Sequence, residues 1–337
     1  MRKQSFELAR GQPQSMDLNR VLIRAEDITD PNYGYEPERR PLLEHLRLGF
    51  INLDKPVGPT SHEVVAWVKR LMGLGKAGHA GTLDPKVSGV LPVALEDATK
   101  ALQALSGADK EYVCLMHLHS EVPEQRLREV LSEFTGEIYQ RPPLRSAVKR
   151  QLRRRRVYSL QLLEREGKDA LLKIHCEAGT YIRKLIFDIG EALGCGAHML
   201  ELRRSRSGPF AEDETLVRLQ DVADAYALWK EEGREDLLRK VILPVEASVR
   251  ALPKIVIRDG AVDALCHGAS LAAPGVLRVE TGISVGSIVA VMTLKGELVA
   301  LMESLMTSRQ IVEADKGLVA KPVRVVMRPG TYPRKWK

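Results

Sequence analysis

The chain lacks the residues that several protein classes require. Its 337 residues include four cysteines and no CxxC pair, so neither a disulfide framework nor a cysteine-rich zinc site is indicated. No apolar run approaches the roughly 18 residues that a membrane span needs, and the N-terminal segment MRKQSFELARGQ has no apolar signal-peptide core. We therefore expect a cytoplasmic protein with reduced thiols.

Motifs for nucleotide hydrolysis, serine catalysis and zinc catalysis are also missing: there is no Walker-type loop, GxSxG or HExxH. The stretch GLGKAG at 73–78 has the form GxGxxG, but it follows a predicted helix, so its glycines are better explained as a helix stop and a turn. His117 and His119 form an HxH pair without a third ligand at a sensible spacing. The sequence therefore predicts neither a metal nor a cofactor.

Aromatic residues are scarce, at 5%, and acidic residues are outnumbered, so that the net charge is +7. Such a charge favours an anionic partner, nucleic acid or a membrane surface, although a protein that is merely basic would show it too. Two tracts, 141–156 and 318–337, carry eight and six basic residues and no acid. The first, RPPLRSAVKRQLRRRR, is typical of an arm that contacts phosphates; the alternative is a solvated loop.

Changes in composition and residue pattern divide the chain into three parts. Residues 1–47 are polar and predict an extended arm that packs on the C-terminal domain. Residues 48–249 mix helical patterns with alternating, antiparallel-looking strands, which indicates an α+β domain. From 250 to 337, short strands between glycines predict a small β-barrel or sandwich.

Several elements of the central domain follow from local patterns. GFINL at 49–53 predicts a strand, and DKPVGP a turn that holds Lys55. Thr60 and Glu63 have the spacing of a capping box, before apolar residues at helical spacing. Residues 110–119 and 169–179 predict strands, and 180–194 a helix with Ile182 and Leu185 on its apolar face.

Asp84, in the stretch AGHAGTLDPKVSGVL at 77–91, is the most informative acidic residue. An aspartate before a proline is often a turn former, and that interpretation stands on local grounds. The alternative is a reactive carboxylate in a closed pocket, paired with an arginine such as Arg183, with Tyr181 or Tyr112 offering a ring to a planar substrate. Arg183 as a surface charge and the tyrosines as core residues remain the plain alternatives.

Five separated stretches then carry a resemblance: INLDKPVGPTSHEVV, AGHAGTLDPKVSGVLPVAL, KEYV, GTYIRKL and LRRSRSGPF. In this order they resemble the motifs of the TruB-type pseudouridine synthases, over residues 48–210. The N-terminal arm, QRPPLRSAVKR and the part after 250 resemble the archaeal dyskerin-like branch, the catalytic subunit of box H/ACA ribonucleoproteins. The resemblance implies a mixed, mostly antiparallel bent sheet with flanking helices, followed by a PUA-like RNA-binding β-barrel.

The resemblance also implies the chemistry and the residues that perform it. Uridine is isomerised to pseudouridine without any cofactor or metal. Asp84 falls on the catalytic aspartate, Arg183 on the arginine that pairs with it, and Tyr181 on a second motif tyrosine, which we regard as a candidate for proton transfer.

Four further side chains are expected to bind the substrate. Tyr112 falls on the tyrosine that stacks on the target base, His79 on a histidine that holds the flipped nucleotide, and Leu202 on an apolar residue that lines the pocket. We place Lys55 in the same group.

RNA is the partner that the resemblance implies: an H/ACA guide RNA, target rRNA and the T-loop of tRNA. Its implied protein partners are Nop-type and Gar-type accessory proteins and a kink-turn-binding ribosomal-protein homologue, with the Gar-type protein regulating a thumb loop at about 141–156. A stand-alone tRNA enzyme and a catalytically silent RNA-binding scaffold are the alternatives. The expected RNA-binding residues are Arg141, Arg145, Lys149, Arg150, Arg153, Arg154, His267 and Gly268.

Overall fold

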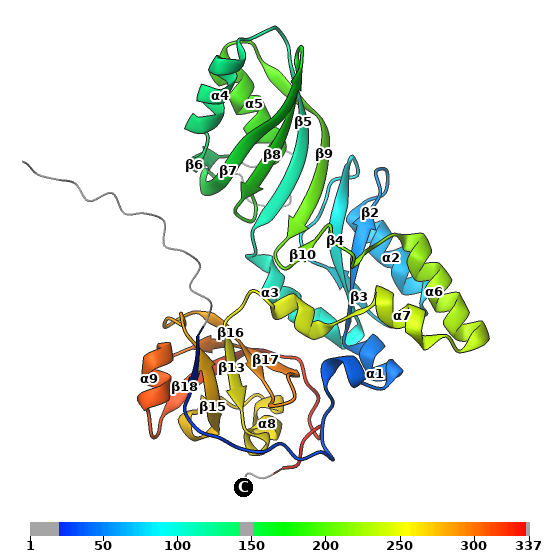
Figure 1. The fold of residues 1–337 in the computed structure, drawn as a ribbon, viewed down its shortest axis with the longest axis vertical. Coiled ribbons are helices and arrows are strands. Elements are labelled where there is room, and N and C mark those ends of the chain that lie inside the picture. Colours follow the sequence, from blue (N-terminus) through cyan, green and yellow to red (C-terminus); the bar gives the residue numbers. More distant parts are fainter. Residues whose placement is uncertain (1–19, 142–150, 335–337) are drawn as a thin grey trace, which may run out of the picture.

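The computed structural model describes residues 20–141 and 151–334. Within them the chain forms a large unit built on one long sheet and a smaller C-terminal β unit that lies against one end of it (Figure 1). Arg145, Lys149 and Arg150 fall outside the described residues. No helix within those ranges is long and apolar enough to cross a membrane.

In the described residues the large unit contains an eleven-stranded, mostly antiparallel sheet with the path β11-β2-β4-β9-β5-β8-β7-β6. The short strands β3, β10 and β12 pair with β4, β9 and β2. The pairs β4–β9 and β11–β2 are parallel. The strands are β2 (Gly49–Lys55), β3 (Ala77–His79), β4 (Val87–Leu95), β5 (Lys110–Leu118), β6 (Gly136–Gln140), β7 (Arg153–Glu166), β8 (Asp169–Cys176), β9 (Ala197–Ser207), β10 (Phe210–Ala211), β11 (Leu216–Val217) and β12 (Leu243–Pro244).

Helices cover this sheet in two groups, as Figure 1 shows: α4 and α5 on its upper half, α2, α6 and α7 beside its lower half. The capping box predicted at Thr60 and Glu63 is confirmed at the start of α2. Helix α5 buries the predicted apolar face and ends at Gly194 in the left-handed conformation. The helical segments are η1 (Pro37–Arg39), α1 (Leu42–Arg47), α2 (Ser61–Leu71), η2 (Glu96–Leu102), α3 (Gln103–Ser106), α4 (Glu124–Glu133), α5 (Ile182–Leu193), α6 (Leu219–Glu232), α7 (Glu235–Val241) and η3 (Val245–Val249).

The C-terminal unit is a curled seven-stranded sheet, among the described residues, in the order β1-β15-β13-β16-β17-β18-β14. Its first strand comes from the N-terminal arm, because β1 pairs antiparallel with β15. The elements are β1 (Val21–Ile23), β13 (Lys254–Ile257), α8 (Asp259–Cys266), β14 (Leu271–Ala272), η4 (Ala273–Gly275), β15 (Val276–Glu280), β16 (Ile288–Met292), β17 (Leu298–Ser304), α9 (Ser308–Glu313) and β18 (Leu318–Val325).

The two units share a hydrophobic core, so they form a continuous body. Phe50 and Val90 of the large unit belong to the same buried cluster as Met292 and Leu301 of the small one. Beside this cluster Arg40, which is 2% exposed, donates twice to the carboxylate of Glu246, at 2.7 and 2.9 Å. The contact ties the arm to the segment that leads into the C-terminal unit.

Two predicted boundaries are wrong. The arm was expected to run to residue 47, but Leu42 and Leu46 of α1 pack into the core of the large unit. The basic loop was expected to run to residue 156, but 153–156 open strand β7 and pair with β6. Alternation within a four-arginine run carries no hydrophobic signal, so this strand could not be recognised from its sequence.

Candidate active site

The loop between β3 and β4 places Asp84 at the centre of the large sheet. The Asp84 carbonyl accepts a hydrogen bond from the Val87 amide at 3.0 Å, which closes a tight turn. The buried Ser61 hydroxyl bonds to both polar groups of the Leu83 main chain, at 2.8 and 3.0 Å. The turn is therefore made by the backbone and by α2, which leaves the Asp84 carboxylate available for another contact.

That contact is with Arg183, which lies 99 residues further along the chain, in the first turn of α5. Its Nη2 lies 2.6 Å from Oδ2 of Asp84. Both side chains are 59% exposed, so the closed pocket expected from the sequence is instead an open site. The local interpretation of Asp84 as a turn residue thus describes its backbone, and the ion pair describes its side chain.

The N-terminus of α5 is fixed by a residue that the sequence did not single out. Tyr181 is the N-cap, and its amide donates to Oε1 of Gln140 at 3.0 Å. Nε2 of Gln140 returns a bond to the Tyr181 carbonyl at 3.2 Å, and Gln140 is 2% exposed. Strand β6 therefore holds Tyr181, and with it the turn that carries Arg183.

Four residues form one row across the sheet beneath this loop. Strand register pairs Lys55 with Gly89, Gly89 with Arg204, and Arg204 with Tyr112, on β2, β4, β9 and β5. Paired residues point to the same face, so their side chains are neighbours. Burial raises the pKa of the Tyr112 hydroxyl, and nearby Arg204 opposes that effect.

Leu202 occupies the position that the sequence suggested for a pocket wall. It is 8% exposed and packs in the same buried cluster as Leu83 and Val87, the residues that flank Asp84 closely in the turn. Tyr112 packs against this cluster. An apolar floor therefore lies beside the carboxylate.

Lys55 requires a correction. It is the last residue of β2, is 0% exposed, and its ammonium donates to the carbonyls of Pro56 and Val87, both at 2.8 Å. Burial lowers its pKa, and the Asp84 carboxylate opposes that effect. This burial leaves no surface for the predicted substrate contact; instead Lys55 supports the turn that carries Asp84.

His79, at the end of β3, lies with its ring 4.9 Å from that of His62, edge to face. Burial, helped by His62 and Arg204, lowers the pKa of His79 to about 4, so the ring is neutral at physiological pH. Its Nδ1 is buried and has no hydrogen-bond partner among the described residues. The half-buried ring of His79 is therefore uncharged where it lies beside His62.

The remaining predicted RNA-binding residues that the structure describes lie on or next to β6 and β7 and in the small unit. Arg141 is exposed at the end of β6, and Arg154, on β7, pairs with Glu137 across the strands at 3.3 Å. His267 caps the C-terminus of α8 in the small unit, followed by Gly268 with a positive φ of 87°.

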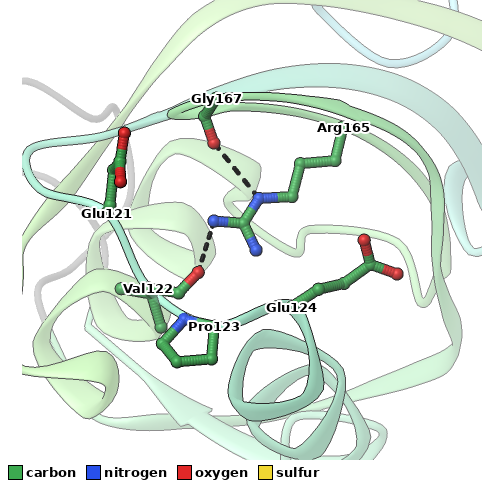
Figure 2. Close-up of a pocket in the computed structure, with 6 residues that line it drawn as sticks. All are labelled: Glu121, Val122, Pro123, Glu124, Arg165 and Gly167. Atoms are coloured by element: carbon green, nitrogen blue, oxygen red, sulfur yellow. Dashed lines mark hydrogen bonds between the residues drawn. The ribbon is translucent and has the colours of Figure 1, made fainter.

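A pocket lies at the far end of β5, and neither Asp84 nor Arg183 is among the residues that line it. Figure 2 shows this pocket, of about 550 Å³, with Glu121 and Glu124 on its wall and Arg165 across it. The Arg165 guanidinium donates to the carbonyls of Val122 and Gly167, the latter at 3.2 Å. Those bonds anchor the loop, so Arg165 acts here as a structural residue.

The histidines near this end acquire a third neighbour in the fold. His198 lies opposite His117 in the sheet, and its Nδ1 is 3.0 Å from Nε2 of His119. His117 in turn bonds to Asp169 at 2.6 Å. Across the described part of the chain no group of three such side chains is arranged to hold a metal ion.

Family models cover nearly the whole chain. A model described as TruB family pseudouridylate synthase (N terminal domain) matches residues 69–182, and one described as tRNA pseudouridylate synthase B C-terminal domain matches 183–250. A PUA domain model matches 253–326 and a DKCLD (NUC011) domain model 13–65.

Individual relatives agree with these models. The probable tRNA pseudouridine synthase B of Methanopyrus kandleri is 59% identical over 321 residues, 95% of each chain. That of Pyrococcus furiosus is 58% identical over 323 residues, again 95% of each. Among solved structures, one chain of a Cbf5-Nop10-Gar1 complex has a TM-score of 0.91 at 58% identity, over 94% of this chain and 96% of that one. A chain from an H/ACA RNP bound to a substrate RNA containing 2'-deoxyuridine has a TM-score of 0.90 at 55% identity, over 94% and 98%.

Proposed function

The chain belongs to the TruB family of pseudouridine synthases, which are isomerases, and we propose that it isomerises uridines that an H/ACA guide RNA presents. In this proposal Asp84 is the catalytic residue. The observation that carries the proposal is the Asp84–Arg183 pair at 2.6 Å, formed by two distant motifs. Arginine cannot lose its proton, so Arg183 is a permanent counter-ion for the carboxylate beside the apolar floor.

The reaction breaks the bond from ribose C1′ to uracil N1 and makes one from C1′ to C5. Carbon C5 loses a proton and N1 gains one, so no oxidant, reductant or outside group is consumed. Asp84 stabilises the detached sugar or bonds to it as the nucleophile. Tyr181, held by Gln140, is our candidate for the proton transfer at C5.

Because the site is open in the free protein, the bound RNA would complete the pocket around Asp84. A uridine inside a duplex cannot reach Asp84, so it must leave its stack. The flipped base would lie against Tyr112 and Leu202 and cover the 59% exposed pair, which strengthens the electrostatic contact by excluding water. The neutral His79 would lie near the nucleotide without adding a charge.

Asp84→Asn tests the catalytic assignment, because it keeps the shape of the side chain and removes its charge. We expect pseudouridine formation to stop while RNA binding persists. Asp188→Asn is the matched control, because Asp188 pairs with Lys184 on the outer part of α5. Pseudouridine formation by the Asp84→Asn protein would show that another group performs the chemistry.

Two substrate classes follow from different comparisons. The curated relatives are named as tRNA pseudouridine synthases, whereas the structural neighbours include an H/ACA ribonucleoprotein with substrate RNA. We favour guided modification of rRNA, with the T-loop uridine of tRNA as a second substrate. The measurement is pseudouridine on bare tRNA and on an rRNA fragment, each with and without an H/ACA guide; modification of tRNA alone would identify a stand-alone enzyme. Binding of these RNAs without any pseudouridine would identify a silent scaffold.

The PUA domain is the part that we assign to the guide RNA. Deleting it would remove Met292 and Leu301 from the shared core and expose Phe50 and Val90 of the large unit, so point variants are the better test. We expect His267→Ala combined with Arg324→Glu, which changes an exposed side chain of β18, to weaken guide binding several-fold. Arg128→Glu on α4 is the control for the change of charge; equal losses would argue against this role.

Protein partners follow from the same relatives. A neighbouring structure contains Nop10 and Gar1, and we propose that Nop-type and Gar-type proteins bind this chain as well. The exposed Tyr139 and Leu152 flank residues 142–150, where a Gar-type regulator of the basic loop would dock. A kink-turn-binding partner would join through the guide RNA. Tyr139→Ser with Leu152→Ser should abolish capture of the Gar-type protein and leave capture of the Nop-type protein intact.

A further inference from the structure

Three basic side chains lie buried beneath the loop that carries Asp84. Lys55, Lys110 and Arg204 are 0%, 6% and 1% exposed. In the part of the chain that the structure describes, each of them donates to main-chain carbonyls and none forms a salt bridge with a carboxylate. Buried charges without an ionic partner are costly, so their presence calls for a reason beyond filling space.

Of these three basic residues, Arg204 lies between the loop that carries Asp84 and the side chain of Tyr112. Its Nε donates to the carbonyl of Val90 and its Nη2 to that of Gly81, both at 2.8 Å. Gly81 lies three residues before Asp84. On the other side Arg204 on β9 is paired with Tyr112 on β5, so the two side chains are neighbours on the same face of the sheet. One rigid, planar group therefore contacts the strand and loop that hold the carboxylate and lies beside the ring that faces the base.

Two glycines make room for this contact. A Cβ on Gly89 would lie 2.2 Å from the Arg204 carbonyl oxygen, closer than real atoms approach. A Cβ on Gly81, whose φ is +72°, would lie 3.1 Å from Nη1 of Arg204. Gly89 thus allows the main chain of β4 to approach that of β9 closely, and Gly81 leaves room for the guanidinium beside the loop.

An apolar side chain would fill this volume at a lower cost. Burial lowers the pKa of Arg204, and the positive charges of Lys55 and Lys110 lie near it. Its neighbour two residues earlier on the same face, Leu202, shows that the strand accepts an apolar residue. A leucine or methionine could not bond to the carbonyls of Val90 and Gly81, and so could not tie the Asp84 loop to the strand that lies beside Tyr112.

We propose that Arg204 is a positioning residue for the isomerisation, because it fixes the Tyr112 ring relative to the Asp84 loop and so brings the bound base to the carboxylate. The inference rests on the proposed function. Displacing a reacting group by about 1 Å costs on the order of 100-fold in rate, which sets the size of the expected effect.

The first measurement is the single-turnover rate of pseudouridine formation at saturating enzyme. Arg204→Met should be slowed about 100-fold, while Arg204→Lys, whose single ammonium cannot reach both partners, should fall between it and the wild type. Arg206→Met is the matched control: Arg206 lies two residues further along β9 and pairs with Asp109. Circular dichroism at the assay temperature checks folding, and if Arg204→Met does not fold, Arg204→Lys carries both measurements.

The second measurement separates positioning from general support of the fold. In an Asp84→Asn background, which prevents turnover, affinity is compared for substrate RNA with uridine or an abasic site at the target position. A stacked base contributes about 1–3 kcal/mol, roughly 5- to 150-fold in affinity. We expect Arg204→Met to bring the ratio of the affinity for uridine RNA to the affinity for abasic RNA close to one. Arg206→Met should leave this ratio unchanged.

The outcomes distinguish the two proposals. A wild-type protein that forms no pseudouridine on guided RNA or tRNA refutes the proposed function, and the inference with it. An active wild type with equally fast Arg204 variants overturns the inference alone. So does a slowed Arg204→Met protein that retains the wild-type preference for uridine over the abasic RNA, since Tyr112 would then not depend on Arg204.

Discussion

Lys110 makes the stability of this protein depend on pH in a predictable direction. It opens β5, is 6% exposed, and donates to the carbonyls of Ala108 and Leu105. Burial lowers its pKa from 10.5 to about 8; nearby Arg204 adds to the shift and Asp109 opposes it. Replacing Lys110 by methionine removes the titrating group and keeps most of its volume.

The sign and the size follow from the shift. Between pH 8 and 10.5 the unfolded chain holds a proton on Lys110 that the native protein has released. The contribution of Lys110 is therefore complete above the unfolded pKa and is lost as the pH falls through the folded pKa. At about 1.4 kcal/mol per pH unit, a gap of about 2.5 units gives about 3 kcal/mol.

The assay is guanidinium unfolding of the wild type and Lys110→Met at pH 7, 8, 9 and 10. The free energy of unfolding of the wild type should rise relative to that of the variant by about 2.5 kcal/mol between pH 7 and pH 10, which is most of the full difference. Taking the difference cancels groups common to both proteins. Lys69→Met, on the exposed side of α2, is the control. Parallel stability curves for the wild type and Lys110→Met would refute the reasoning.

Three further changes test individual contacts. Arg40→Met leaves the Glu246 carboxylate unpaired between the two units and should cost about 3–5 kcal/mol in guanidinium unfolding; a loss below 1 kcal/mol would mean that water replaces the arginine. Gln140→Ala leaves the Tyr181 amide without its partner, while the Tyr181 carbonyl keeps its bond from the Leu185 amide; we expect about 1–3 kcal/mol of lost stability and slower turnover, measured on the same preparation. Thr60→Ala removes the N-cap of α2 and should cost about 1 kcal/mol, seen as a lower melting temperature with normal RNA binding.

Local order in the sequence was enough to predict many elements near the site. The capping box at Thr60 and the apolar face of α5 depend on residues three or four apart, which a short window contains. In KEYVCLMHLH the alternation places Lys110, Tyr112 and Cys114 on one face of a strand, and that face is the inward one. The motif resemblance, which depends on order along the chain, singled out Asp84 and Arg183.

The fold decided which residues that are far apart in the chain come into contact. Only the pairing of β2, β4, β9 and β5 brings Lys55, Arg204 and Tyr112 into one row, and only that row shows Lys55 to be buried support. Arg204 lies in a sequence segment rich in arginines, and its charge predicts an exposed side chain, whereas the structure buries it. The sequence by itself determined which groups are present and which strands and helices carry them. The tertiary structure decided which of those groups meet, because strand register sets contacts between segments that no local pattern connects.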